Sequence, residues 1–153
     1  MEKNEEAFLF CLKLIKKRDY SEKEISARLK KKDYDGDTIK DTAARLKAKG
    51  YIDDTRVARN VFEKHTVFKP SGAFLIRKKM EERGISEELI NEIISGLDEK
   101  ELLRKAVNNI RKKKVFDRDK LCRKEYWYKR LLSLGFEGEL IENNMDIIKE
   151  EDN

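Results

Sequence analysis

The sequence predicts an all-α protein made of three tandem three-helix repeats with a period of 51 residues. Three observations predict this fold. Apolar residues recur in register at an offset of 51, their spacing within each copy is that of one helix face, and no stretch alternates as a strand would. The expected repeats are residues 1–51, 52–102 and 103–153, the last with an acidic C-terminal tail. One such unit buries little alone, so we expect the three to stack into an elongated, curved array.

Three segments fix the register, because they align without a gap. They begin at Arg28, Lys79 and Arg130 and read RLKKKDYDGDTI, KMEERGISEELI and RLLSLGFEGELI. Six apolar positions recur in all three copies, which chance does not explain. These positions are Ile25, Ile76 and Trp127; Leu29, Met80 and Leu131; Tyr34, Ile85 and Phe136; Ile39, Ile90 and Ile141; Ala43, Ile94 and Met145; and Leu46, Leu97 and Ile148.

The first helix of each repeat carries an apolar face at helical spacing. In the second repeat Pro70 closes this helix near Phe68, because the residue before a proline is pushed out of the α region. The three faces are Ala7, Phe10, Cys11 and Leu14; Val57, Ala58, Val61 and Phe62; and Leu103, Ala106 and Ile110.

The second helix of each repeat has a recognisable start or end. In the first repeat Ser21 and Glu24 form a capping box at the start. All three copies then end on a residue that tolerates a left-handed conformation, followed by a large apolar residue that can fold back on the last turn. These pairs are Asp33 and Tyr34, Gly84 and Ile85, and Gly135 and Phe136.

The third helix follows at once. Asp35 and Ser86 can cap it in the first two repeats, because their side-chain oxygens accept from free backbone N–H groups. Glu137 is a poorer cap at the equivalent position, so the last helix should start less firmly. We expect nine helices of roughly 11 to 17 residues.

A junction segment, KGYIDDTRVARNVF at 49–62, joins the first two repeats. Gly50 is expected to end the preceding helix, Tyr51 and Ile52 to plug the joint, and Asp53 or Asp54 to cap the helix beginning near Thr55. A metal pair is the other interpretation of the two aspartates. Capping explains them without an ion, and no further carboxylate or histidine has suitable spacing.

Charge is abundant and segregated: 44% of residues are charged and 39% are hydrophobic. Residues 13–32 hold nine Lys/Arg against three acids, and residues 104–130 hold twelve against three, whereas the tail from Glu137 is acidic. The basic tracts indicate a polyanionic partner or an acidic protein surface; solvation of helix faces is the alternative. We expect no membrane segment and no secretory signal. Two cysteines at unrelated positions, Cys11 and Cys122, suit a reduced cytoplasmic protein.

Three segments resemble the RecX family of bacterial regulators of the RecA recombinase. They are GYIDDTRVA (50–58), YSEKEISARLKKKDY (20–34) and LIRKKMEERGISEELI (75–90). The resemblance covers nearly the whole chain. There are departures: Val57 stands where the family has an aromatic residue, FKPSGAF replaces a Lys-Gly-Pro arrangement, and Leu134 stands where a basic residue often precedes Gly-Phe.

The resemblance implies a binding protein of DNA repair and the SOS response, with no cofactor and no chemistry of its own. Family members lie in the groove of the RecA filament on single-stranded DNA. There they hinder filament growth, strand exchange, ATP hydrolysis and co-protease activity. We expect a monomer with no metal and no catalytic residue. The single histidine, His65, has no nucleophile beside it in any recognisable motif, so a place on a helix face is favoured over a general base.

Arg28, Lys79 and Arg130 recur at the 51-residue offset and could form a row facing a repeating polymer; a snorkelling stem that covers the core edge is the alternative. Aromatics and charges also alternate in the tract 111–130, where Trp127 is expected in the core. The residues expected to contact a partner or nucleic acid are Arg28, Lys31, Arg56, Arg59, Arg77, Lys79, Arg123, Lys124, Tyr126, Tyr128 and Arg130.

A second hypothesis is a free-standing DNA-binding protein of helix-turn-helix-like units. Its binding would fall steeply with salt and would not need RecA, whereas filament binding would require assembled RecA. An enzyme is a third class, and the sequence offers it no nucleophile, base or metal set.

Overall fold

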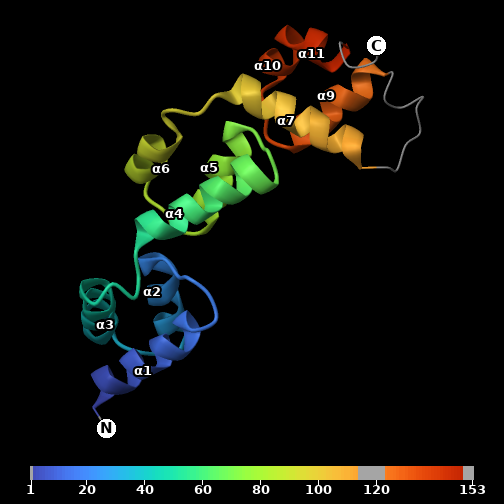
Figure 1. Cartoon of the computed structure of the whole chain (residues 1–153). Helices are drawn as coiled ribbons and strands as arrows, with labels where there is room; N and C mark the ends of the chain where they lie inside the picture. The colour runs from blue at the N-terminus through green and yellow to red at the C-terminus, as the bar shows by residue number, and fades with distance from the viewer. Residues whose placement is uncertain (1, 114–122, 150–153) are drawn as a thin grey trace. The chain divides into compact units, whose positions relative to one another are not determined.

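The computed structural model describes residues 2–113 and 123–149, and every regular element in these two ranges is a helix (Figure 1). The prediction of an all-α chain is confirmed. The elements are α1 (Lys3–Ile15), α2 (Glu22–Lys31), α3 (Gly36–Ala48), α4 (Asp54–Glu63), the π-helix η1 (Lys64–Phe68), α5 (Ala73–Glu82), α6 (Glu87–Ile94), α7 (Glu99–Lys112), α9 (Lys124–Ser133), α10 (Gly138–Asn143) and α11 (Met145–Lys149).

Two compact units make up the chain. Unit 1 combines the residues up to Asn60 with Met80–Asn91, and unit 2 combines Val61–Lys79 with the residues from Glu92 onward. These limits differ from the predicted repeat boundaries, since they pass through α4, α5 and α6. The repeats are defined by sequence register and the units by contacts, so the division into three repeats stays a prediction.

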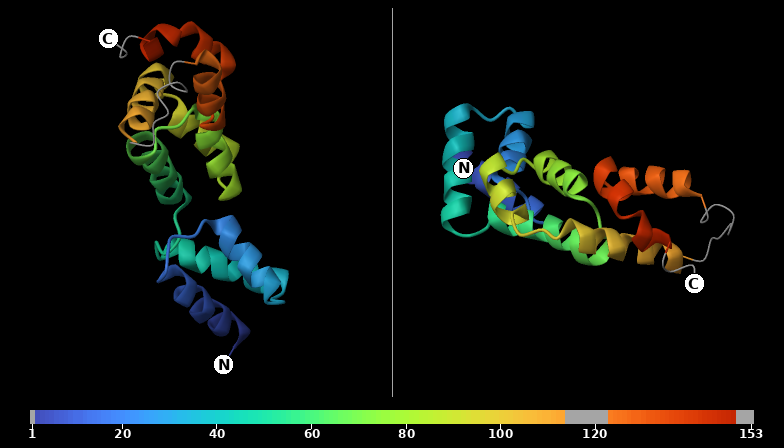
Figure 2. Two further views of the ribbon diagram at one scale, coloured as in Figure 1. Left: turned by 90° about the vertical axis from the view of Figure 1, so that its right-hand side faces the viewer. Right: turned by 90° about the horizontal axis from the view of Figure 1, so that it is seen from above.

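The core of unit 1 lies where α1 and α2 both pack against α3, as two views show (Figures 1 and 2). Cys11, Ile25, Leu29 and Leu46 are fully buried there. The isoleucine and the two leucines each contribute about 1.5–3 kcal/mol by leaving water. The whole cluster consists of Ala7, Phe8, Cys11, Tyr20, Ile25, Leu29, Leu46 and Ile52.

In unit 2, α10 packs on α9 and on α11, and α11 packs on α7. Trp127 of α9 is 1% exposed, which confirms its place in the core. The Arg111 guanidinium lies 5.2 Å from the Trp127 ring centre and also donates to the carbonyl of Ile148. One side chain therefore contacts both α9 and α11.

The same C-terminal motif ends α2, α5 and α9. In each case a residue with positive φ follows the helix, and the N–H after it donates to the carbonyl five residues back. The φ angles are 63° at Asp33, 76° at Gly84 and 87° at Gly135. The predicted left-handed ends are confirmed in all three copies. The bonds run from Tyr34 to Leu29 (3.3 Å), from Ile85 to Met80 (3.1 Å) and from Phe136 to Leu131 (3.2 Å).

Helix starts also follow the sequence. Ser21 and Glu24 form the predicted capping box. Asp35 accepts from the N–H of Thr38 at 2.9 Å, which holds the pKa of its carboxyl below the usual range. Ser86 accepts from Leu89 at 3.3 Å.

The last helix departs from the prediction. Glu137 makes no side-chain cap, as its chemistry predicted, and Asn144 then divides the expected helix into α10 and α11. The Asn144 side chain donates to the carbonyl of Leu140 at 2.7 Å. Asparagine favours such local bonding over a helix interior. The expected lengths are wrong as well, because described helices run from 5 residues in α11 to 14 in α7.

The boundary expected at 102/103 falls inside α7. The Asp98 side chain accepts from the N–H of Glu101 at 3.1 Å and so starts this helix earlier than the repeat pattern indicated. The apolar face predicted for it is correct, since Leu103, Ala106 and Ile110 are buried.

A contact in unit 1 recurs in unit 2 at the 51-residue offset. In unit 1 the hydroxyl of Ser21 donates to the carbonyl of Arg83 at 2.5 Å. In unit 2 the N–H of Gly72 donates to the carbonyl of Leu134 at 2.8 Å. Ser21 and Gly72 are equivalent positions, as are Arg83 and Leu134. Equivalent positions are thus in contact in both units, through a side-chain donor in unit 1 and a backbone donor in unit 2.

The side chains around this contact are charged in unit 1 and apolar in unit 2. In unit 1 the Arg83 guanidinium bonds the Glu24 carboxylate at 2.6 Å, and the same side chain donates to the carbonyl of Asp19 at 2.9 Å. Burial raises the pKa of Glu24, but the bonds from Arg83 and the Ser21 N–H outweigh this and leave the pKa lowered. The equivalent residues of unit 2 are Leu75 and Leu134. An ion pair in one copy is replaced by two leucines in the other.

Candidate functional site

Within the junction, the two aspartates cap different helices. Asp53 accepts from the N–H groups of Thr55 at 3.0 Å and Arg56 at 3.3 Å, so it caps α4. Asp54 accepts instead from the N–H of Glu22 at 2.9 Å, at the start of α2. Both carboxylates are therefore used inside unit 1.

Ile52 and Tyr51 differ in burial at the junction. Ile52 is 2% exposed and belongs to the unit 1 core, whereas Tyr51 is 42% exposed. Its ring meets Phe8 edge-on, with 6.2 Å between ring centres. Ile52 therefore fills the buried position, and the expectation that Tyr51 and Ile52 plug the joint between repeats stays a prediction. Gly50 ends α3 with φ 75°, and Tyr51 N–H closes that end by donating to Leu46 O at 2.9 Å.

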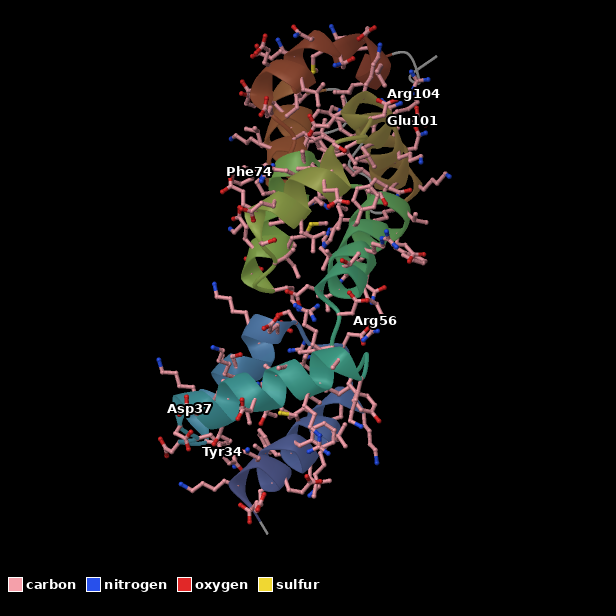
Figure 3. The ribbon with its side chains drawn as sticks, turned by 90° about the vertical axis from the view of Figure 1, so that its left-hand side faces the viewer. Tyr34, Asp37, Arg56, Phe74, Glu101 and Arg104 are labelled. Atoms are coloured by element: carbon pink, nitrogen blue, oxygen red, sulfur yellow. The ribbon has the colours of Figure 1, made fainter. Side chains whose placement is uncertain are left out.

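Arg56 braces this segment from the side (Figure 3). Its guanidinium donates to the carbonyls of Gly50 at 3.4 Å and Tyr51 at 3.3 Å, and it pairs with Asp19 at 3.3 Å. Arg59, one turn further on, is exposed. Of these two predicted contact residues, Arg56 is engaged within unit 1 and Arg59 faces solvent.

In the parts of the chain that the structure covers, no group of three or more His, Cys, Asp or Glu could hold a metal ion. Cys11 is buried, and burial raises the pKa of its thiol to about 11, so it stays protonated. Cys122 lies outside the described residues. None of the described helices has the length and apolar content needed to cross a membrane.

His65 is buried in η1, and its Nδ1 lies 3.2 Å from the Ser71 hydroxyl. Burial lowers the pKa of the imidazole, and the charges of Lys64, Lys79 and Lys69 lower it further. Ser71 also donates to the carbonyl of Lys69 at 2.7 Å. The pair therefore fixes the loop after η1, which is a structural role rather than that of an activated nucleophile and base.

Two predicted contact residues of unit 1 lie together. Arg28 and Lys31 line a surface hollow of about 290 Å³ with Lys32 and Phe10; we call it the unit 1 hollow. The Lys32 ammonium lies 5.5 Å from the centre of the Phe10 ring. The hollow thus combines three cations with one aromatic face.

The charges of the unit 1 hollow are not neutralised internally. Within residues 2–113 and 123–149, Arg28, Lys31 and Lys32 make no ion pair, whereas Arg45 pairs with Glu5 at 2.8 Å and Arg83 with Glu24. Three cations without a carboxylate attract an anionic group, either phosphate or carboxylate.

Unit 2 holds seven predicted contact residues. Arg123, Lys124 and Arg130 are exposed, and the remaining four are half-buried. Tyr126 packs edge-on against Trp127, with 5.7 Å between ring centres. Lys124 and Tyr128 line one hollow, and Arg130 lines another. The half-buried four are Arg77, Lys79, Tyr126 and Tyr128.

The proposed row of Arg28, Lys79 and Arg130 is divided between the units. Arg28 is in unit 1 and the other two are in unit 2. Arg28 and Arg130 are exposed, which suits either contact with a partner or a snorkelling side chain. Lys79 is half-buried and already interacts with another group of the protein. The row stays a prediction.

Phe10 and Lys32 of the unit 1 hollow were not among the predicted contact residues. Phe10 has helical spacing with Ala7 and Leu14, and that pattern predicts burial. The ring is only half-buried, so the apolar pattern could not tell a core position from the floor of a hollow. Phe10 lies four residues before Leu14 and beside a basic tract, and neither fact distinguishes a binding position from a core position.

Known proteins resemble this chain along most of its length. A family model described as RecX, first three-helix domain, matches residues 7–46. Regulatory protein RecX of Clostridium botulinum (strain Alaska E43 / Type E3) is 34% identical, covering 96% of this chain and 71% of the relative. Regulatory protein RecX of Chlorobium phaeobacteroides (strain BS1) is 29% identical, covering 95% of each.

Two crystal structures have the same fold. One is RecX from Lactobacillus salivarius, with a TM-score of 0.75 and 18% identity, covering 97% of this chain and 96% of that one. The other is a regulatory protein RecX, with a TM-score of 0.74 and 20% identity, covering 94% and 73%. At these identities the two structures establish the fold alone.

Proposed function

The chain belongs to the RecX family of regulatory proteins, and on that premise we propose that it regulates RecA by binding RecA filaments on single-stranded DNA. The observation that carries the proposal is the 34% identity to a regulatory protein RecX over nearly the whole chain. The segments that resemble the family include the junction, whose capping and bracing contacts hold it in a defined shape within unit 1.

The regulation is by binding. The protein occupies the filament groove as a monomer in the cytoplasm and hinders filament extension, ATP hydrolysis, strand exchange and co-protease activity. This places it in DNA repair and the SOS response. Exposed cations support the proposal, because Arg28, Lys31 and Arg130 offer positive charge to an acidic or phosphate-bearing surface.

A free-standing DNA-binding protein is the second candidate. The unit 1 hollow favours it, since single-strand binders combine cations with an aromatic face for a base, and Phe10 with Lys32 has that chemistry. The two functions differ in whether assembled RecA is needed and in the response to salt.

Binding measured on two probes separates them. The labelled protein is titrated with RecA assembled on oligo(dT) and with the same oligonucleotide alone, at about 50 and 200 mM salt. RecA regulation predicts tight binding to the filament at both salt concentrations and much weaker binding to the naked strand. Equal binding to both probes, lost at the higher salt, assigns the protein to the second candidate.

A charge-reversal variant tests the row. Arg28→Glu/Lys79→Glu/Arg130→Glu should weaken filament binding by about tenfold or more while the circular dichroism stays helical. The matched control is Lys49→Glu/Lys78→Glu/Lys129→Glu, which changes the same net charge at exposed positions. If the folded row variant binds as tightly as the wild type, the three residues belong to core-edge packing. Equal weakening in both triples would assign the loss to net charge and not to the row.

A further inference from the structure

The π-helix η1 of unit 2 presents apolar side chains to solvent. Val67 is 64% exposed and Phe68 is 70% exposed. Phe74, at the start of α5 (Figure 3), is 67% exposed. Large exposed apolar groups close together in sequence mark binding surfaces more often than accidents of packing. Short π-helical turns are also frequent at functional sites.

The backbone around η1 is fixed, so these side chains cannot simply turn inward. The N–H of Lys69 donates to the carbonyl of Lys64 at 2.8 Å, and the N–H of Ser71 donates to the carbonyl of His65 at 2.9 Å. Both His65 and Ser71 are buried. The loop is held from inside by its polar residues, and its apolar residues face outward.

Phe68 also forms one wall of a surface hollow of about 290 Å³, which we call the unit 2 hollow. Its apolar side includes Ile110 of α7 and Leu134 after α9. Three cations, Lys69, Lys113 and Arg130, also line it, and no described acidic residue does. Arg130 is a predicted contact residue, but the hollow itself was not predicted.

We propose that the unit 2 hollow is the docking site for a segment of a protein partner that inserts an apolar side chain flanked by carboxylates. The hollow is suited to such a side chain, because the aliphatic groups of Ile110 and Leu134 can pack closely around an inserted apolar group. The cations match the flanking carboxylates. A single strand of DNA is less well matched, since bases need stacked aromatic faces and the hollow offers only Phe68.

This inference rests on the proposed function in taking the partner to be the RecA filament, and it adds where that protein is held. Phe68→Ala removes the apolar wall, and Arg130→Glu reverses one cation. Each has a matched control on the surface of the same unit. Leu132→Ala removes an exposed apolar side chain of α9 that does not line the hollow, and Lys129→Glu reverses a charge one residue away.

The four variants are titrated against RecA assembled on oligo(dT) and against oligo(dT) alone, with helicity checked for each. We expect Phe68→Ala and Arg130→Glu to weaken filament binding by about tenfold, and the controls to stay within about twofold. If the wild type binds the filament and all four variants bind as tightly, the inference is wrong and the proposed function stands.

Two further outcomes also decide the matter. If the wild type does not bind the filament, the proposed function fails and the docking site falls with it. If Phe68→Ala and Arg130→Glu weaken binding to the naked strand as much as to the filament, the occupant is nucleic acid and the inferred protein segment is wrong.

Discussion

Gly72 has no room for a side chain. A Cβ atom at this position would lie 2.2 Å from the carbonyl oxygen of Gly135, which is backbone and cannot turn away. We predict that Gly72→Ala lowers the free energy of unfolding by about 2 kcal/mol, because the two chain segments must move apart. Urea-induced unfolding followed by circular dichroism measures it.

Gly36 provides the control. It begins α3, and a Cβ atom there would meet no other part of the protein within 4 Å. Gly36→Ala should leave stability unchanged or raise it by up to about 1 kcal/mol, since it restricts the unfolded chain. Equal losses in both variants would show that the close approach at Gly72 is not what limits the side chain.

His65 predicts a pH dependence of stability. Burial and the charges of Lys64, Lys79 and Lys69 lower its pKa in the folded state, so the folded protein resists protonation where the unfolded chain accepts it. Its contribution is complete above the ordinary value of about 6.5 and is lost as the pH falls below it.

The test compares wild type with His65→Gln at pH 7.5 and 5.5. We expect the free energy of unfolding of the wild type to fall more between these two pH values than that of the variant. The same change in both proteins would mean that other groups carry the dependence.

The sequence predicted the local capping contacts of single residues but not their long-range hydrogen bonds. Ser21, Asp35 and Ser86 cap the helices expected, because a cap bonds N–H groups two or three residues away and the pattern is local. The sequence left open whether Asp53 or Asp54 caps α4. It gave no sign of the bond from Glu22, 32 residues away, that Asp54 accepts. Glu99 accepts from the N–H of Ala73 at 2.8 Å and likewise could not be foreseen.

At the scale of elements, helix ends were predictable and helix lengths were not. The ends at Asp33, Gly84 and Gly135 follow from a backbone conformation that few residue types adopt. The break at Asn144 follows from a weak preference that competes with packing, so the apolar pattern alone predicted one continuous helix. The turn to π-helix before Pro70 was also not foreseen.

The ion pair between Glu24 of α2 and Arg83 in the turn after α5 can be tested by mutation. Arg83→Leu should lower stability by about 2 kcal/mol, because half-buried Glu24 loses its closest cation and keeps only Arg18, 3.5 Å away. Glu24→Leu/Arg83→Leu copies the leucine pair found at the equivalent positions of unit 2. We expect it to lose less stability than the two single variants added together.

A double-mutant cycle in urea measures this coupling, which should be about 1 kcal/mol. Additive single losses would mean that Glu24 and Arg83 act separately, the first as a cap and the second as a brace on Asp19.

For the whole molecule, the all-α class and the family could be predicted from the sequence, because both rest on periodic apolar positions and on distinctive local segments. The binding surfaces could not. The unit 1 hollow needs Phe10 of α1 beside Arg28 of α2, and the unit 2 hollow needs Phe68 beside Arg130. Both bring together residues far apart in the chain, and single-sequence patterns carry no record of such pairs.

The proposed action on RecA can be measured through ATP hydrolysis by RecA on single-stranded DNA. The purified protein is added at few copies per filament, at two salt concentrations. The account predicts strong inhibition at these ratios, as expected for a protein that binds the filament and hinders its extension. Unchanged hydrolysis, together with salt-sensitive binding of the protein to naked DNA, would contradict it.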